Sequence, residues 1–262
     1  MNNTKVFLKD ENVFNKIIDA SELEKDDVVI EIGSGDGRLT KRIAPLVKKV
    51  YAIELDTNLF DSSRTLIDLK NIEFINADAL KIEFPKEANK IISNLPYAIS
   101  SPITEKIVYF LNKRPDSLAV LMYQLEFGER MLAFPGIRDY SMISVFTQYT
   151  SKVEFISKVS KNSFRPKPAV ESIIIRLTPK KIIVDEGFLK FTRLLFQHKK
   201  KNLYSALIDS RSALNLSKDQ LRERLAAYKK KELLKEKVFY LEIAELEDIY
   251  NEMLELGICK KM

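Results

Sequence analysis

The chain has 262 residues, 45% of them hydrophobic, and a formal net charge of +6. This length suits one large domain and a smaller one, with enough apolar residues for a substantial core. A single cysteine, Cys259, and a single histidine, His198, exclude a disulfide framework, a Cys/His metal site and the usual Ser-His or Cys-His nucleophile pairs. No apolar run approaches the roughly 20 residues of a membrane span, and the N-terminus lacks a signal-peptide core. We therefore expect a cytoplasmic protein that binds neither a membrane nor a metal ion.

The first half of the chain alternates short apolar runs with helical patterns. A leading helix is expected over residues 10–18 and a second helix over 38–47. Apolar runs of strand type occupy 28–32, 49–53, 72–75, 91–93 and 118–123. This alternation predicts an α/β fold with a doubly wound parallel sheet.

The second half of the chain becomes helical. Helices are expected over 126–133 and 141–149, followed by strands over 153–159 and 170–177. Beyond the break at Thr178-Pro179 four helical patterns follow, over 186–195, 204–210, 218–228 and 243–256. We therefore expect a catalytic α/β domain over residues 1–180 and a small all-α domain over residues 181–262.

Polar and glycine residues follow the predicted strands in an ordered way. Gly33 and Gly35 follow the first strand and let the backbone approach a ligand closely. Glu54 ends the second strand, where a carboxylate can accept from two ribose hydroxyls. Asp78 follows the third strand and can accept from an adenine amine, with Ala79 as apolar cover. The glycine spacing differs from that of dinucleotide sites, so the pattern predicts a pocket for S-adenosylmethionine.

The fourth strand ends in Asn94-Leu95-Pro96-Tyr97. The Asn94 side-chain oxygen and the Leu95 carbonyl can accept hydrogen bonds from the exocyclic amine of a nucleobase. Pro96 restricts the loop, and Tyr97 can stack on the base. The stretch alone fits equally well a strand end with a capping Asn and a packed Tyr. Beside a cofactor pocket it predicts methyl transfer to a nucleobase amine.

A second aromatic residue, Phe164, precedes two prolines and is flanked by Arg165 and Lys167. These neighbours predict an exposed rim position, where Phe164 and Tyr97 would sandwich a base extruded from RNA. No side chain with a tuned pKa is evident from the sequence, and the released proton can pass to water.

With these motifs the chain resembles the rRNA adenine N6,N6-dimethyltransferase family, and its small-subunit, archaeal and eukaryotic branch in particular. The resemblance rests on 7–10, 31–37, 54–56, 78–80, 94–103, 121–130 and 163–172. It implies a class I methyltransferase sheet of Rossmann-like topology, with Leu8, Leu55 and Asn94 as further cofactor contacts. It also implies methylation of two adjacent adenosines near the 3′ end of small-subunit rRNA, with the small ribosomal subunit as partner and the protein as a monomer. Thr4-Lys5-Val6 departs from the family's usual Gly-Gln-Asn or Gly-Gln-Cys.

Basic residues concentrate in the predicted helical domain. From Arg193 to Lys237, Lys and Arg outnumber Asp and Glu by 13 to 5. A lysine-rich solvated surface would give the same composition. Beside a site for a nucleobase, the excess favours an RNA-binding surface that includes Lys199, Lys200 and Lys201, with Arg165 and Lys167 nearer the catalytic motif.

Other functions remain open at this stage. A DNA adenine methylase or a glutamine methylase of release factors would more often carry a second proline at position 95. A large-subunit rRNA adenine methylase would be close kin. A non-catalytic ribosome-assembly factor could keep the fold as a scaffold, although the intact glycines, Glu54, Asp78 and Asn94 count against this.

Overall fold

The structure is a computed structural model that describes residues 6–114, 116–180 and 182–260. The chain divides into two compact units. The sheet unit comprises Met1–Glu129 and Thr150–Ile182, and the helical unit comprises Arg130–Tyr149 and Ile183–Met262. The chain leaves the sheet unit for the second time after residue 182, close to the expected boundary at residue 180. The segment 130–149, expected in the catalytic domain, instead belongs to the helical unit, because the Tyr149 ring packs 4.7 Å from that of Phe188.

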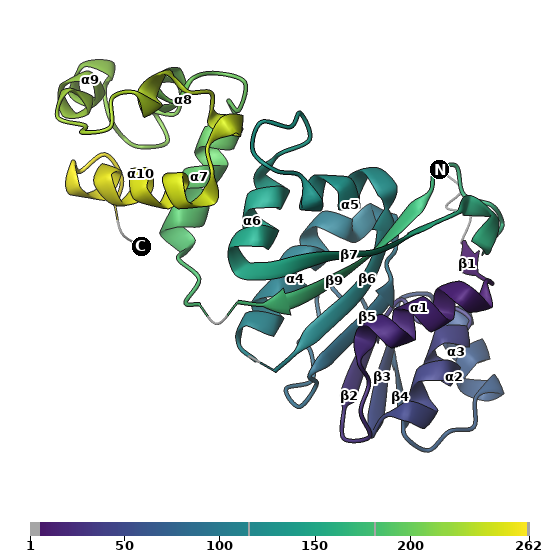
Figure 1. The fold of residues 1–262 in the computed structure, drawn as a ribbon. Helices are drawn as coiled ribbons and strands as arrows, with labels where there is room; N and C mark the ends of the chain where they lie inside the picture. The colour runs from purple at the N-terminus through teal and green to yellow at the C-terminus, as the bar shows by residue number, and fades with distance from the viewer. Residues whose placement is uncertain (1–5, 115, 181, 261–262) are drawn as a thin grey trace. The chain divides into compact units, whose positions relative to one another are not determined.

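The sheet unit contains, within the described residues, a seven-stranded sheet of order β4-β3-β2-β5-β6-β9-β7 (Figure 1). Its strands are β2 (Val28–Ile32), β3 (Lys49–Glu54), β4 (Ile72–Asn76), β5 (Lys90–Asn94), β6 (Leu118–Gln124), β7 (Ser151–Val159) and β9 (Ser172–Pro179). Strands β2 to β6 pair in parallel, which confirms the doubly wound α/β prediction. The sheet is not purely parallel, because β9 pairs antiparallel with both of its neighbours, β6 and β7. Side-chain period does not encode this direction.

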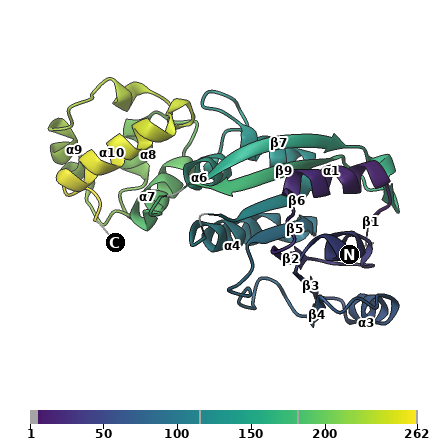
Figure 2. The same ribbon diagram turned by 60° about the horizontal axis from the view of Figure 1, so that its bottom comes forward.

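Helices cover both faces of this sheet (Figure 2). They are α1 (Glu11–Ser21), α2 (Arg38–Ile43), α3 (Thr57–Leu66), α4 (Ser100–Asn112) and α5 (Leu125–Leu132). Asp10 caps α1, since its side chain accepts from the Asn12 N–H at 3.0 Å. The helix expected over 38–47 ends early because Pro45 lies in a 3-10 turn, Ala44–Leu46, that follows α2. Helix α1 packs on β6 and β7, and α4 packs on β6 and β9.

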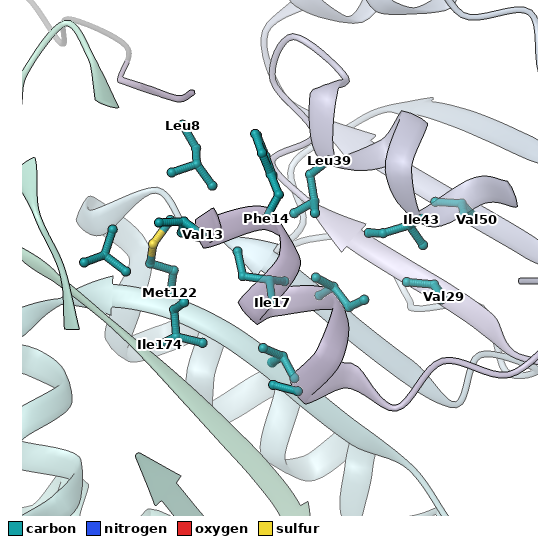
Figure 3. Close-up of a cluster of buried hydrophobic side chains, with 14 of the residues drawn as sticks. Leu8, Val13, Phe14, Ile17, Val29, Leu39, Ile43, Val50, Met122 and Ile174 are labelled. Carbon is teal, nitrogen blue, oxygen red and sulfur yellow. The ribbon is translucent and has the colours of Figure 1, made fainter. Parts of the chain in front are cut away.

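A hydrophobic core joins α1 and α2 to the strands (Figure 3). Its labelled members are Leu8, Val13, Phe14, Ile17, Val29, Leu39, Ile43, Val50, Met122 and Ile174. Each is buried, and burial of one such large side chain stabilises the fold by about 1.5–3 kcal/mol. This packing attaches α1 and α2 to the central strands.

Two short segments far apart in sequence form a separate antiparallel pair. β1 (Phe7–Leu8) pairs with β8 (Phe164–Arg165), so that Leu8 lies opposite Phe164. The Ser163 hydroxyl donates to Asp10 Oδ2 at 2.8 Å and extends the connection. The N-terminal segment is thereby attached to the motif around Phe164. Thr4 and Lys5, part of the departure from the family pattern, lie outside the described residues.

The helical unit contains α6 (Met142–Thr150), α7 (Glu186–Phe196), α8 (Leu203–Asp209), α9 (Lys218–Ala226) and α10 (Ile243–Glu255). The four predicted C-terminal helices are confirmed, each end within two residues. Phe188 and Phe191 of α7 pack on Tyr250 of α10, with ring centroids 6.0 and 5.6 Å apart. Aromatic packing of this kind gives the unit a core of its own.

Candidate active site

A cavity of about 530 Å³ lies at the carboxyl ends of β2, β3 and β5. In open α/β sheets this is the edge at which ligands bind. Six of the predicted cofactor residues line it together: Leu8, Gly33, Gly35, Glu54, Leu55 and Asn94. Three of the four segments follow β2, β3 and β5, whose parallel carboxyl ends lie at the same edge of the sheet, and Leu8 comes from β1, which pairs with β8.

The glycine loop after β2 adopts backbone conformations that residues with a side chain rarely adopt. Gly33 and Gly35 have φ angles of +71° and +56°. A methyl group on Gly33 would lie 3.3 Å from the ring of Pro96, so the glycine loop packs closely against the loop after β5. Gly35 lies similarly against the Phe7 ring, at 3.6 Å. The glycines therefore let three loops converge around the cavity.

Glu54 is held in place by backbone groups. The Gly35 N–H donates to Glu54 Oε2 and the Asp56 N–H donates to Oε1, each at 2.9 Å. Each carboxylate oxygen can accept a second hydrogen bond. Glu54 can therefore bind two hydroxyl groups without reorienting. The neighbouring Leu55 side chain is exposed at the cavity, where it can cover an apolar ring.

Asp78 and Ala79 are not among the residues that line this cavity. Asp78 Oδ1 accepts from the Leu80 N–H at 2.9 Å, and Lys81 Nζ lies 3.6 Å from Oδ2. Ala79 is buried, and its carbonyl accepts from the Lys106 ammonium at 2.7 Å. Contact of these two residues with an adenine ring therefore stays a prediction.

Asn94 ends β5 at the cavity wall. It pairs in register with Met122, and the following Leu95 N–H donates to the Met122 carbonyl at 3.2 Å. Leu95 is buried, which fixes the loop. The Asn94 carboxamide has no hydrogen-bond partner in the described part of the chain. A half-buried amide without a partner is available to a ligand.

Tyr97 lies between this cavity and a second one of about 390 Å³, since Tyr97 and Val6 line both. Its hydroxyl is 2.6 Å from the Ser172 hydroxyl, and Ser172 is fully buried at the start of β9. Burial raises the pKa of the Tyr97 phenol, so the group stays neutral. Ser172 ends the motif that begins near Phe164, and its contact with Tyr97 does not follow from the sequence.

The second cavity is bordered by the proline-rich loop that follows Phe164. Lys167 and Val170 line it, together with Gln124 at the end of β6. The Gln124 carboxamide makes no hydrogen bond to any residue that the structure describes. A flat ring placed here would lie next to Tyr97 and the first cavity.

The expected rim position of Phe164 is wrong. Its side chain is only 3% exposed, because β8 pairs with β1 and places Phe164 in the core cluster with Phe14. Phe164 nevertheless lines the first cavity, as does Tyr97. Stacking of a base between the two rings stays a prediction.

Glu31 is a residue of the cavity wall that the sequence analysis missed. Its carboxyl is buried within β2 and accepts from the Thr40 hydroxyl at 2.5 Å. Burial, together with the nearby negative charges of Asp36 and Glu54, raises the pKa of Glu31 to about 8. A cationic ligand group would favour the ionised form. The sequence feature that could have identified Glu31 is the presence of a charged residue within an apolar strand.

A model of the ribosomal RNA adenine dimethylase family matches residues 2–247 of the chain. The protein belongs to this family. A relative from Methanococcus maripaludis, named as a probable ribosomal RNA small subunit methyltransferase A, is 44% identical over 239 residues, which are 89% of each chain. The crystal structure of a dimethyladenosine transferase from Plasmodium falciparum superposes with a TM-score of 0.82 at 28% identity, covering 96% of this chain and 98% of that one. That of the 23S rRNA methyltransferase ErmE gives a TM-score of 0.67 at 26% identity, covering 94% and 98%.

The predicted RNA-binding residues of this family member differ in whether their charged groups are free to contact RNA. Arg165 and Lys167 are exposed in the sheet unit. In the helical unit, the Lys199 ammonium donates to the Arg138 and Tyr140 carbonyls at 2.9 and 2.7 Å, and burial lowers its pKa. Lys201 pairs with Asp209 at 2.7 Å, whereas Lys200 is exposed and has no ion pair within the described residues. RNA binding by the lysine triplet stays a prediction, and Lys199 is committed to backbone contacts.

Within residues 6–114, 116–180 and 182–260, no group of three or more His, Cys, Asp or Glu side chains is arranged to hold a metal ion. No helix in the same ranges is both long and apolar enough to cross a bilayer.

Proposed function

We propose that the protein uses S-adenosylmethionine to methylate N6 of two adjacent adenosines near the 3′ end of small-subunit rRNA during ribosome biogenesis. The observation that carries this proposal is the Asn94 carboxamide. It has no partner in the described chain, and it lines the same cavity as the fixed carboxylate of Glu54 and the ring of Tyr97. An acceptor for an amine thus lies beside a site suited to a ribose.

The cavity suits the cofactor in size and in chemistry. Glu54 would accept from the ribose hydroxyls, and Leu55 would cover the adenine of the cofactor. Glu31 lies in the same wall, where its carboxyl would favour the cationic methionine end over a neutral one. When bound, the cofactor supplies an electrophilic methyl group on its sulfonium.

The protein's own contribution is to prepare the amine and to hold it. The N6 lone pair of adenine is delocalised into the ring, which makes the amine a poor nucleophile. The Asn94 oxygen and the Leu95 carbonyl would accept from the two N6 hydrogens and favour a tetrahedral nitrogen. Fixing this nitrogen in line with the methyl group removes much of the remaining barrier. The proton of the methylated amine would pass to water.

The target base must leave the RNA stack to reach Asn94. Tyr97 lines both cavities, so a base held in the second cavity would lie against its ring. Asn94 and Phe164 both line the first cavity, so a base that reaches Asn94 would lie between the Tyr97 and Phe164 rings. The exposed Arg165 and Lys167 would bind flanking phosphates.

The relatives favour the small over the large subunit as substrate. The match to the small-subunit relative from Methanococcus maripaludis has the higher identity, and the dimethyladenosine transferase superposes more closely than ErmE. A non-catalytic role on the same fold has less support, because Glu54 and Asn94 keep the geometry that ligands require.

The test is transfer of tritiated methyl groups to unmodified small ribosomal subunits, with large subunits as the matched control. Nuclease mapping should place the label at two adjacent adenosines of the small-subunit rRNA. Label on the large subunit alone would support the alternative substrate. Cofactor binding without any transfer would favour the assembly-factor role.

A further inference from the structure

The loop between α5 and α6 packs against a distant turn of the helical unit (Figure 1). The Gly136 N–H donates to the Phe239 carbonyl at 2.7 Å. A methyl group on Gly136, whose φ is +86°, would lie 3.2 Å from the ring of Tyr240. The rings of Phe239 and Tyr240 are themselves 4.5 Å apart. Segments a hundred residues apart in sequence thus form one surface.

This surface exposes large apolar side chains. Phe134 is 66% exposed, Ile137 48% and Tyr240 49%, and we call these three residues the apolar patch. A turn hydrogen bond from the Ile137 N–H to the Phe134 carbonyl, at 3.2 Å, keeps the first two close together. Exposed apolar side chains that gather in this way mark interaction sites.

Cations surround the apolar patch. Lys199 binds the Arg138 and Tyr140 carbonyls through its ammonium, and its own carbonyl accepts from the Phe239 N–H at 3.2 Å. This places Arg138 and Lys200 beside the patch. Both are exposed, and neither has an ion pair within the described ranges. Asp139, in the same turn, and Glu242, two residues beyond Tyr240, are acidic neighbours of this surface.

We propose that the apolar patch is a stacking platform for unpaired nucleotides of the RNA substrate, with Arg138 and Lys200 binding the adjacent phosphates. Exposed rings among free cations are the combination that single-stranded RNA requires, because bases stack on the rings while phosphates meet the charges. A protein partner would more often cover an apolar centre depleted of charge. The proposal rests on the proposed function for the identity of the RNA.

The experiment measures binding of the full-length protein to protein-free small-subunit rRNA at several salt concentrations. The double variant Phe134→Ala/Tyr240→Ala should lose about tenfold in affinity for each stacked base. Its salt dependence should not change, because no charge is removed. The variant Arg138→Ala/Lys200→Ala should instead flatten the slope of log affinity against log salt, by about 0.7 for each lost contact to single-stranded RNA.

Two further variants separate stacking from folding. Tyr240→Phe keeps the ring that packs on Gly136 and should bind as the parent does, whereas Tyr240→Leu keeps apolar volume without the ring and should bind weakly. Phe155, 52% exposed on β7 of the sheet unit, supplies the matched control, and Phe155→Ala should leave rRNA affinity unchanged. Thermal unfolding of each variant confirms that it is folded.

Weaker rRNA binding by Phe134→Ala/Tyr240→Ala and by Tyr240→Leu, at an unchanged salt slope, supports the platform. Parental affinity of both variants for rRNA overturns it. Weaker binding to whole subunits with unchanged binding to free rRNA also overturns it and indicates a protein partner. Methyl transfer by the parent is assayed in parallel, so that a failure of the proposed function is seen separately from these binding results.

Discussion

At the scale of single residues, Glu54 and Asn94 differ in whether their side-chain oxygens already accept hydrogen bonds from the protein. Both oxygens of Glu54 already accept backbone hydrogen bonds, whereas the Asn94 carboxamide has no partner in the described chain. Loss of the Glu54 side chain therefore frees the Gly35 and Asp56 N–H groups as well as removing a ligand acceptor. Loss of the Asn94 side chain removes only an acceptor for the ligand.

We expect Glu54→Ala to weaken S-adenosylmethionine binding by about 1–3 kcal/mol, because hydrogen bonds to a charged acceptor are lost. Glu54→Gln is the matched control, since its amide oxygen still accepts and its loss should be smaller. Asp78→Ala should have less effect than Glu54→Ala, since Asp78 does not line the cavity. Calorimetric titration measures all three, and an unchanged affinity of Glu54→Ala would remove the ribose assignment.

Asn94→Ala should lower the single-turnover rate of methyl transfer by about 100-fold or more, while cofactor and RNA affinities change much less. Tyr97→Ala should instead cost about 1–3 kcal/mol in capture of the extruded base. Single-turnover assays with saturating cofactor and varied subunit concentration separate the two defects. An Asn94→Ala protein that transfers methyl groups at the parental rate would make the scaffold role the leading one.

At the scale of elements, the loop after β5 is held from two sides. Pro96 packs against Gly33 on the glycine loop, and Tyr97 meets Ser172 at the start of β9 through a hydroxyl pair 2.6 Å apart. The orientation of the Tyr97 ring therefore depends on β9, the strand whose antiparallel insertion the sequence pattern did not predict. We infer that Ser172 is a positioning residue for Tyr97.

Ser172→Ala and Tyr97→Phe should each raise the subunit concentration needed for half-maximal rate several-fold, and the double variant should add little, because both remove one hydrogen bond. Ser172→Thr, which keeps the hydroxyl, should restore the parental value. Tyr123→Phe is the matched control, since it breaks a similar pair with Thr104, 2.8 Å apart, among residues that line neither cavity. Additive effects of the two single variants would contradict the positioning role.

At the scale of the whole molecule, the buried carboxyl of Glu31 links the stability of the fold to pH. Its pKa in the folded protein is about 8, above the ordinary 4.5, so the folded state holds the proton more tightly than the unfolded state. Between about pH 4.5 and pH 8 the free energy of unfolding should therefore fall as the pH rises, by an amount on the order of a few kcal/mol.

Glu31→Gln should flatten this dependence, since it keeps an oxygen that accepts from Thr40 and removes the titrating group. Calorimetric melting of the cofactor-free protein at pH 5, 6.5 and 8 would measure it, on the expectation that the parent loses stability over this range and the variant loses much less. Equal pH dependence of parent and variant would show that Glu31 does not titrate in this range.

Local patterns in the sequence are sufficient to predict several parts of this protein. Alternating apolar runs and helical periods specify the strands β2 to β6 and the helices α7 to α10, because both depend on neighbours in the chain. The grouping of the glycines, Glu54 and Asn94 around one cavity follows from the same logic, since these residues end parallel strands that must meet at one edge.

Other features depend on contacts between distant segments and could not be predicted from local patterns. The pairing of β1 with β8 buries Phe164, and the charge state of Glu31 follows from its burial in β2. Asp78 accepts from the Leu80 N–H and is not among the residues that line the cavity, and Lys199 is committed to carbonyls of the loop after α5. Each outcome depends on packing and on desolvation, and these free energies arise between residues that lie far apart along the chain.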